Sequence, residues 1–276
     1  CKWFPHKKGG PYRKWYGNND FVLNWKGGGE ELYKFATKLY GSPTRIIKNT
    51  HRYYQEAVTW SHTTSSHFSA RLLESGFVFN VEAPSLFGVD ADIFLPFLCS
   101  KVGTKLIETM NPTLHFISSS VGDLPFDVES IQREKDQLNL IYKNAISIAK
   151  CDWDLYEVSW RFSTFPLFGG HDHGKRLKDN YHNIRATWSE MTRGMQLLEE
   201  KNNTLFINIY GLQNEVSSDV LLKDITLTCN PHYRYGGNRS EEELEALLQC
   251  DTLKELVSYA IGCMMGRYSL DKPGLI

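Results

Sequence analysis

Lysines and arginines alternate with aromatic residues near the start of the chain, in "KWFPHKKGGPYRKWYGNNDFVLNW" (2–25). Ammonium and guanidinium groups at this density can neutralise phosphates, and Asn side chains can pair bidentately with adenine in the major groove of DNA. A second polar stretch, "TWSHTTSSHFSAR" (59–71), adds short hydroxyl, imidazole and guanidinium groups that suit contacts with a nucleic-acid backbone. These residue types predict a DNA-binding set made of Lys7, Lys8, Arg13, Lys14, Asn18, Asn19, Ser61, His62, Ser69 and Arg71.

Structural roles compete with binding roles in the same stretch. Trp3, Trp15, Tyr16 and Trp25 have the size and polarity of core residues, and packing is the expected role for each. The Asn18-Asn19 pair is also typical of a turn. A basic surface without any partner is the alternative to a phosphate-binding face.

The segment Asn230-Pro231-His232-Tyr233 differs at one position from the N-P-P-Y loop of amino-methyltransferases. In that loop the Asn side chain accepts hydrogen bonds from the target amino group, and the aromatic ring stacks on a flipped base. Here the third residue is His232, and no Gly-rich loop for S-adenosylmethionine occurs anywhere in the sequence. The segment is therefore expected to be an ordinary turn between helices.

Other catalytic or metal-binding patterns are weak. His171, Asp172 and His173 lie in a Gly-rich stretch and would supply at most half of a metal site, which needs three or four converging ligands. Asp90 and Asp92 lack the following Glu-x-Lys strand of a Mg²⁺-dependent nuclease. No P-loop, dinucleotide fingerprint or nucleophile elbow is present in the sequence. We therefore expect the chain itself to be non-catalytic, with no metal and no cofactor of its own.

The chain has 276 residues and a net charge of −1, but the charge is unevenly distributed. Residues 1–71 hold 12 Lys and Arg against 4 Asp and Glu. Such asymmetry fits a polyanion-binding face on a neutral body. The six cysteines form no C-x-x-C pair, which favours reduced thiols and a cytoplasmic protein. The chain begins with Cys1 rather than Met, and we expect it to be part of a longer protein.

The elements that must position these residues form an α+β plan. Short runs rich in β-formers at 21–25, 45–48, 57–60 and 76–82 predict strands. A single buried helix is expected over 92–109, with Pro96 in its first turn. The sequence thus predicts a mixed α/β target-recognition domain over 1–127, followed by a helical, coiled-coil-like spacer over 128–276.

Heptad spacing dominates the second part. One apolar stripe runs from Ile131 to Ile148, and a second runs from Leu177 to Leu212, with Asn202 in one apolar slot. This pattern predicts long helices that pack along their length, as an antiparallel hairpin. Ser240 with Glu243, and Thr252 with Glu255, have capping-box spacing and predict two further helices that meet near Asp251.

Several motifs together resemble the C-terminal half of BREX-type, phage-defence adenine-specific DNA methyltransferases (PglX) and of related type II restriction-modification enzymes. Beyond residues 2–25, the motifs are "VTWS" (58–61), "FSARLLESGFVFNVEAPSLF" (68–87), "NPTLHF" (111–116), "WDLYEVSWRF" (153–162), "INIYGLQNEV" (207–216) and "YAIGCMMGRYSLDKPGL" (259–275). They occur in order over nearly the whole chain. A recognition domain followed by a helical spacer also resembles type I specificity subunits.

The resemblance implies a recognition region for double-stranded DNA within a site-specific adenine N6-methyltransferase, with or without a fused restriction activity. The family's catalytic core, which uses S-adenosylmethionine, would lie upstream in the same chain, and other defence-complex subunits are possible partners. No catalytic residue of the family transfers to this sequence. The alternative from another class is a protein-interaction scaffold of a defence complex that does not itself bind DNA.

Overall fold

A computed structural model describes residues 1–64, 66–168 and 176–276. The fold is mixed α/β, as predicted, and it divides into two compact units. Unit 1 comprises Cys1–Ile146 and Lys201–Ser218, and unit 2 comprises Ser147–Glu200 and Asp219–Ile276. Two long helices contribute residues to both units, so the division is not a single cut in the chain. The boundary proposed between residues 127 and 128 stays a prediction.

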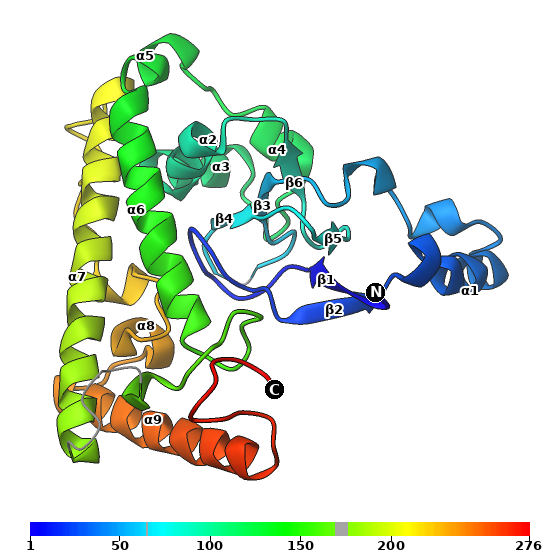
Figure 1. Cartoon of the computed structure of the whole chain (residues 1–276). Helices are drawn as coiled ribbons and strands as arrows, with labels where there is room; N and C mark the ends of the chain where they lie inside the picture. The colour runs from blue at the N-terminus through cyan, green and yellow to red at the C-terminus, as the bar shows by residue number, and fades with distance from the viewer. Residues whose placement is uncertain (65, 169–175) are drawn as a thin grey trace. The chain divides into compact units, whose positions relative to one another are not determined.

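Unit 1 contains two small sheets (Figure 1). In the first, β1 (Trp3–Lys7) pairs antiparallel with β2 (Phe21–Asn24) and parallel with β5 (Val78–Phe79). His6 lies opposite both Phe21 and Val78, which places β1 in the centre of this sheet.

The second sheet is antiparallel and has the order β4-β3-β6. It comprises β3 (Ala57–Trp60), β4 (Ala70–Leu73) and β6 (Ser85–Phe87). Every residue of β3 and β4 is buried. The strand predicted at 57–60 is therefore confirmed. The strand β4 was not predicted, because Arg71 lies among its apolar residues and apolar and polar residues do not alternate along it.

Helices and 3-10 turns surround these sheets. The shorter elements of unit 1 are η1 (Lys26–Gly28), α1 (Glu30–Tyr40), η2 (Pro43–Arg45), η3 (Thr50–Arg52), α2 (Ala91–Cys99), α3 (Lys101–Met110), α4 (Ser118–Gly122) and α5 (Val128–Arg133). The strand predicted at 45–48 is wrong, because Arg45 ends the 3-10 turn η2 and residues 46–48 form no strand.

The single helix predicted over 92–109 is also wrong. It is broken at Ser100, whose backbone is extended and whose hydroxyl accepts a hydrogen bond from Gly103 N at 3.0 Å, as a helix N-cap does. Pro96 lies inside α2 rather than in its first turn. The carbonyl of Pro96 accepts a hydrogen bond from Asn202 Nδ2 at 2.8 Å.

The long helices α6 (Lys135–Asp154) and α7 (Leu177–Tyr210) confirm the two predicted apolar stripes. Figure 1 shows them antiparallel and side by side, and a Cβ built on Gly194 of α7 would lie 3.7 Å from Ile148 Cδ1 of α6. Leu138, Ile141, Trp188 and Met195 are buried on these stripes. Asn202, the polar residue in the heptad, is buried because it anchors α2, so a hydrogen-bonding role explains the departure from the pattern.

The rest of unit 2 is formed by η4 (Pro166–Phe168), η5 (Leu222–Asp224), α8 (Pro231–Tyr235) and α9 (Glu241–Met264). The capping box of Ser240 and Glu243 is confirmed at the start of α9. The second box is wrong, because Thr252 lies inside the continuous helix α9 and donates its hydroxyl proton to Leu248 O at 2.8 Å.

All six cysteines are free thiols, as the sequence predicted. Among the residues that the structure describes, no helix combines the length and the hydrophobicity needed to cross a membrane.

Candidate nucleic-acid interface

The loop over residues 8–20, which joins β1 to β2, is fixed to the edge of β4. Trp15 N donates a hydrogen bond to Ala70 O at 2.9 Å, and Leu72 N donates one to Trp15 O at 2.8 Å. Trp15 and Asn18 have φ angles of 69° and 55°, in the left-handed region that non-glycine residues rarely adopt. The strain indicates that surrounding contacts determine the course of this loop.

Lys7 is fully buried beneath the loop. Its Nζ donates hydrogen bonds to Gly17 O at 2.6 Å, Asn18 O at 3.2 Å and Asn19 Oδ1 at 2.6 Å. Burial, reinforced by the nearby Arg71 charge, holds the pKa of Lys7 well below its usual value. Lys7 therefore fastens the Gly17–Asn19 turn to β1 in this structure.

Arg71 has the corresponding role on β4 and is also fully buried. Its Nη1 donates to Arg13 O at 3.0 Å, and its Nη2 donates to Ser61 Oγ at 3.0 Å. Ser61 Oγ in turn donates to Gly10 O at 2.9 Å, and Ser69 Oγ accepts from Arg13 N at 3.3 Å. Much of the predicted set thus belongs to two hydrogen-bonded groups, one around Lys7 and one around Arg71, and the second joins the loop to β4 and to Ser61 at the end of β3.

The loop packs closely at Gly10. A Cβ built on Gly10 would lie 2.6 Å from Asn18 Nδ2, which donates a hydrogen bond to Pro11 O at 3.0 Å. The absence of a side chain at Gly10 therefore leaves space for the Asn18 side chain.

The structure separates the ten predicted residues by exposure. Eight are buried: Lys7, Arg13, Lys14, Asn18, Asn19, Ser61, Ser69 and Arg71. Lys8 is exposed, with its Nζ 5.4 Å from the centroid of the Phe21 ring, and His62 is half-buried. Of the aromatic residues, Trp15, Tyr16 and Trp25 lie in the core, whereas Trp3 is 54% exposed. DNA contact by the ten residues stays a prediction, and only Lys8 and His62 present their side chains to a ligand at the surface.

Exposed cations follow the loop in the sequence, over residues 26–52. This segment holds six Lys and Arg against two Glu. Lys38, Arg45, Lys48 and Arg52 are all exposed. We name these four residues the basic segment. Their charge is part of the positive excess of residues 1–71, but they were not selected from the sequence. They lie outside the aromatic motif at 2–25, which contains most of the predicted cations.

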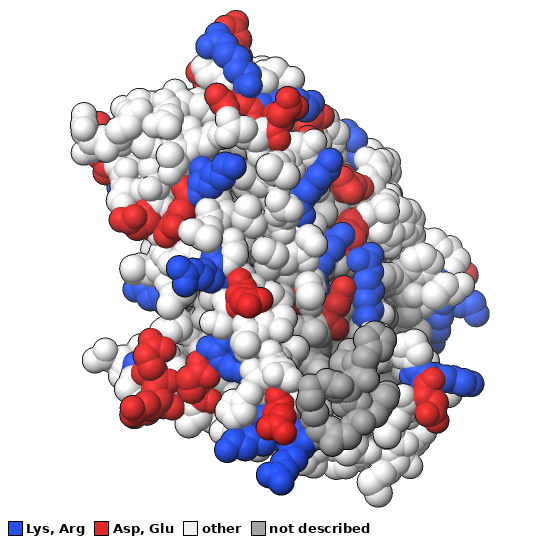
Figure 2. Space-filling model, turned by 60° about the vertical axis from the view of Figure 1, so that its left-hand side comes forward, with Lys and Arg blue, Asp and Glu red and all other residues white. Residues whose placement is uncertain are grey.

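On the face drawn in Figure 2, Lys and Arg are interspersed with Asp and Glu, and neither sign forms a continuous patch. A mixed surface of this kind gives a phosphate backbone no continuous track of positive charge. A local excess such as that of the basic segment is the better candidate for phosphate contact.

Two polar loops meet beside the second sheet. Phe116 N donates to His62 O at 2.7 Å, and Thr64 N donates to Leu114 O at 3.1 Å. Thr63 Oγ1 lies 3.0 Å from His115 Nδ1, and the His62 and His115 rings are 5.6 Å apart. Thr63 and His115 are exposed. The structure thus brings together the "VTWS" and "NPTLHF" motifs in a surface of hydroxyl and imidazole groups, which can hydrogen-bond to base edges or phosphates.

Asn230 is buried and serves as the N-cap of α8. Its Nδ2 donates to Leu222 O at 2.7 Å and to Ile225 O at 2.8 Å, and its Oδ1 accepts from His232 N at 3.2 Å. The segment expected to be an ordinary turn between helices therefore forms the N-cap and the first turn of the short helix α8, which corrects that expectation.

No group of three or more His, Cys, Asp or Glu that could hold a metal ion occurs in the part of the chain that the structure describes. His171, Asp172 and His173 lie outside the described residues.

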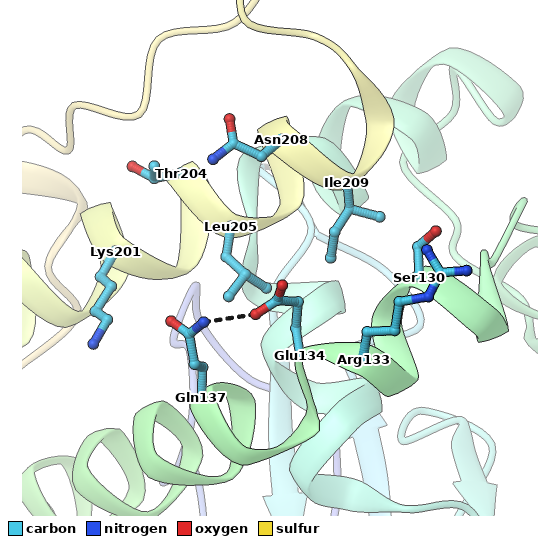
Figure 3. Close-up of a pocket in the computed structure, with 9 residues that line it drawn as sticks. All are labelled: Ser130, Arg133, Glu134, Gln137, Lys201, Thr204, Leu205, Asn208 and Ile209. Carbon is cyan, nitrogen blue, oxygen red and sulfur yellow. Dashed lines mark hydrogen bonds between the residues drawn. The ribbon is translucent and has the colours of Figure 1, made fainter.

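A hollow of about 490 Å³ lies within unit 1, between the α5–α6 junction and the end of α7. Figure 3 shows Leu205 and Ile209 pointing from α7 toward Glu134 and Gln137, whose side chains are hydrogen-bonded at 2.6 Å. Arg133 and Lys201, both exposed, also line it. Its lining is mostly polar, and Leu205 and Ile209 are its apolar residues.

No protein-family model matches the chain. It is 32% identical over 280 residues to the adenine-specific methyltransferase BrxX of Escherichia coli O9:H4 (strain HS). It is also 32% identical over 279 residues to the adenine-specific methyltransferase PglX of Lacticaseibacillus casei (strain Zhang). The alignments cover 100% and 99% of the chain but 22% of each relative, so the chain spans about a fifth of the length of these proteins. The resemblance to BREX-type adenine-specific methyltransferases is confirmed.

Proposed function

We propose that this chain is the DNA-recognition region of a BREX-type adenine-specific DNA methyltransferase. In this proposal it binds double-stranded DNA and positions a short sequence for N6-adenine methylation by an upstream catalytic domain of the same protein, which binds S-adenosylmethionine. The similarity to BrxX and PglX over the whole chain is the observation that carries the proposal.

The exposed groups of unit 1 supply two kinds of contact. The basic segment and Lys8 would neutralise phosphates, which gives affinity without sequence preference. The loops that carry His62, Thr63 and His115 would face base edges. The buried network of Lys7 and Arg71 would act indirectly, by holding the 8–20 loop in place.

Binding to duplex DNA at a series of salt concentrations tests the proposal. We expect the wild-type affinity to fall steeply with salt, because binding releases counterions from the phosphates. The combined variant Lys38→Ala, Arg45→Ala, Lys48→Ala should bind at least roughly tenfold more weakly, and the slope of log K against log salt should become shallower by about 2 to 3. Fluorescence anisotropy with a labelled duplex measures both quantities.

The matched control is Lys143→Ala, Lys178→Ala, Lys223→Ala, which removes the same charge from exposed positions outside the basic segment. Equal losses in both variants would assign the binding to net charge alone. An unchanged affinity and slope in the first variant would remove the basic segment from the interface. Arg13 and Lys14 are less suitable targets, because both are buried and their removal would also disturb the fold.

One observation favours the second candidate, a protein-interaction scaffold. Helix α9 exposes Leu253, Val257, Ile261 and Met264, which recur at spacings of three and four and so share one face of the helix. An exposed apolar stripe of this kind marks a protein contact. If the chain binds no duplex even at low salt, the scaffold becomes the better account.

A further inference from the structure

A cavity of about 380 Å³ lies within unit 2, and none of the residues assigned to DNA contact above lines it. It is formed by the end of α6, the segment that follows it, α8 and α9. The volume is within the range of small-molecule sites, which are lined mostly by apolar and aromatic side chains with a few polar groups.

Four aromatic side chains line the cavity: Trp153, Tyr156, Phe162 and Phe165. Two of them are held by a third ring behind the wall. The Phe162 and Phe165 rings lie 5.9 Å and 5.7 Å from the ring of the buried Tyr259. Packing of this kind fixes the rings in the free protein, so a ligand would not have to order them.

The charged side chains of the lining are Glu157, Glu255 and Arg234, so carboxylates outnumber the guanidinium. Arg234 Nη2 donates to Glu255 Oε1 at 2.7 Å and lies 3.6 Å from Asp251 Oδ2. The guanidinium also stacks on Tyr156, at 5.6 Å from the ring centroid. Arg234 is thus neutralised by its own neighbours. Glu157 is the carboxylate of the lining that Arg234 does not pair with, and it accepts a hydrogen bond from the Tyr268 hydroxyl.

We propose that this cavity binds a small organic cation, of the quaternary or alkylated ammonium class. Aromatic faces attract such cations through their quadrupoles, and the attraction is stronger where the cation is desolvated. The Glu157 carboxylate adds a charge of the complementary sign at the edge of the aromatic wall. A bulky ammonium group also has the apolar surface that suits Phe162 and Phe165.

One feature favours an anion instead. Arg234 Nη1 is buried without a hydrogen-bond partner among the described residues. If that nitrogen governed recognition, a carboxylate would bind better than an ammonium group, so the test includes both charges.

Isothermal titration calorimetry with three probes of one shape decides between these possibilities. The probes are choline, its uncharged isostere dimethylbutanol and the matching carboxylate dimethylbutanoate. We expect choline to bind at least roughly tenfold more tightly than the alcohol, because the two differ mainly in charge, and we expect the carboxylate not to bind. Equal binding of choline and the alcohol, preference for the carboxylate, or no binding of choline at millimolar concentration would each overturn the proposal.

Two variants locate the binding. Glu157→Gln should weaken the affinity for choline at least roughly fivefold and leave the affinity for the alcohol unchanged. The control Glu242→Gln, at an exposed position of α9 outside the cavity, should leave both affinities unchanged. Phe162→Leu keeps an apolar group in the wall and should reduce the preference for choline over the alcohol. Unaltered choline binding in both cavity variants would place the cation elsewhere. DNA binding is measured separately, so neither result depends on the other.

Discussion

Lys7 shows how one buried charge organises the loop that carries the most distinctive motif of the sequence. Three oxygen acceptors of the protein take the place of water around its amine, and two of them are backbone carbonyls of the Gly17–Asn19 turn. Without these acceptors, burying an ammonium group would be very unfavourable, and the depressed pKa shows that burial still disfavours the charged form.

The depressed pKa predicts a pH dependence of stability. Between the folded pKa of Lys7 and its unfolded value of 10.5, the unfolded chain binds more protons than the folded one. The free energy of unfolding therefore gains a contribution that is largest above 10.5 and is lost as the pH falls toward the folded pKa. The stability difference between wild type and Lys7→Met should grow by up to about 1.4 kcal/mol per pH unit across that window.

Urea unfolding at several pH values from neutral to alkaline measures this difference, in which the other titrating groups cancel. The matched control is Lys8→Met, one residue away and exposed, which removes the same charge and leaves the buried acceptors of Lys7 in place. Parallel curves for Lys7→Met and wild type would show that Lys7 keeps its proton on burial.

The burial of Lys7 and Arg71 could not be predicted from the sequence. A charge count treats each Lys and Arg as solvated, which is the usual case. The acceptors of Lys7 are brought into place by left-handed φ angles at Asn18 and Gly17, and no local pattern specifies those angles. The core role of Trp15, Tyr16 and Trp25, by contrast, follows from residue type.

At the scale of elements, α9 shows what a cap signal can and cannot specify. Ser240 N donates to Glu243 Oε2 at 2.9 Å, and Glu243 N donates to Ser240 Oγ at 3.2 Å. The same spacing at Thr252 and Glu255 starts no helix, because the apolar residues on both sides continue one helical face. A capping-box pattern therefore starts a helix only where the preceding residues interrupt that face.

The capping box predicts a measurable loss of stability. Ser240→Ala removes the oxygen that accepts the Glu243 N–H group, and we expect the free energy of unfolding to fall by about 1 kcal/mol. Ser240→Asp keeps an acceptor and should restore most of this loss. Thermal and urea unfolding followed by circular dichroism give both values.

Ser189→Ala is the matched control, because Ser189 is exposed in the middle of α7. It should change stability by no more than about 0.5 kcal/mol. If Ser240→Ala changed the free energy of unfolding as little as Ser189→Ala does, hydrogen bonds from water would replace those of the cap without loss of stability.

Long, periodic elements were predicted more completely than short ones. The stripes of α6 and α7 extend over many turns, so their period was clear despite Asn202. Helix α1 was missed, and of the strand predicted at 76–82 only the two residues of β5 form a strand. The break at Ser100 depends on a side-chain cap inside an apolar run, which hydrophobicity alone does not reveal.

At the scale of the whole molecule, the proposed function depends on a charge imbalance within a nearly neutral chain. A net charge of −1 would not attract DNA, whereas the exposed cations of residues 26–52 would do so locally. The imbalance was evident in the sequence, but the particular cations that reach the solvent were not. The long helices raise a separate question at this scale, because α6 and α7 each pass from one compact unit into the other.

This continuity predicts that the two units unfold together. Leu138 is fully buried in the part of α6 that belongs to unit 1, and Leu138→Ala should lower the free energy of unfolding by about 2–5 kcal/mol. If α6 and α7 couple the two units, the free energy of opening should fall by the same amount for the slowest-exchanging amides of α9 in unit 2 and of β3 in unit 1. Native-state hydrogen exchange measures both sets in one experiment.

The control substitution is Leu140→Ala in the same helix, where the side chain is 54% exposed and the loss should stay below about 1 kcal/mol. Unchanged protection of α9 in Leu138→Ala, together with faster exchange in β3, would mean that the units unfold independently. In that case the helices would act as a hinge region between two separable modules. Equal losses in both units would instead show that α6 and α7 couple the stabilities of the two units.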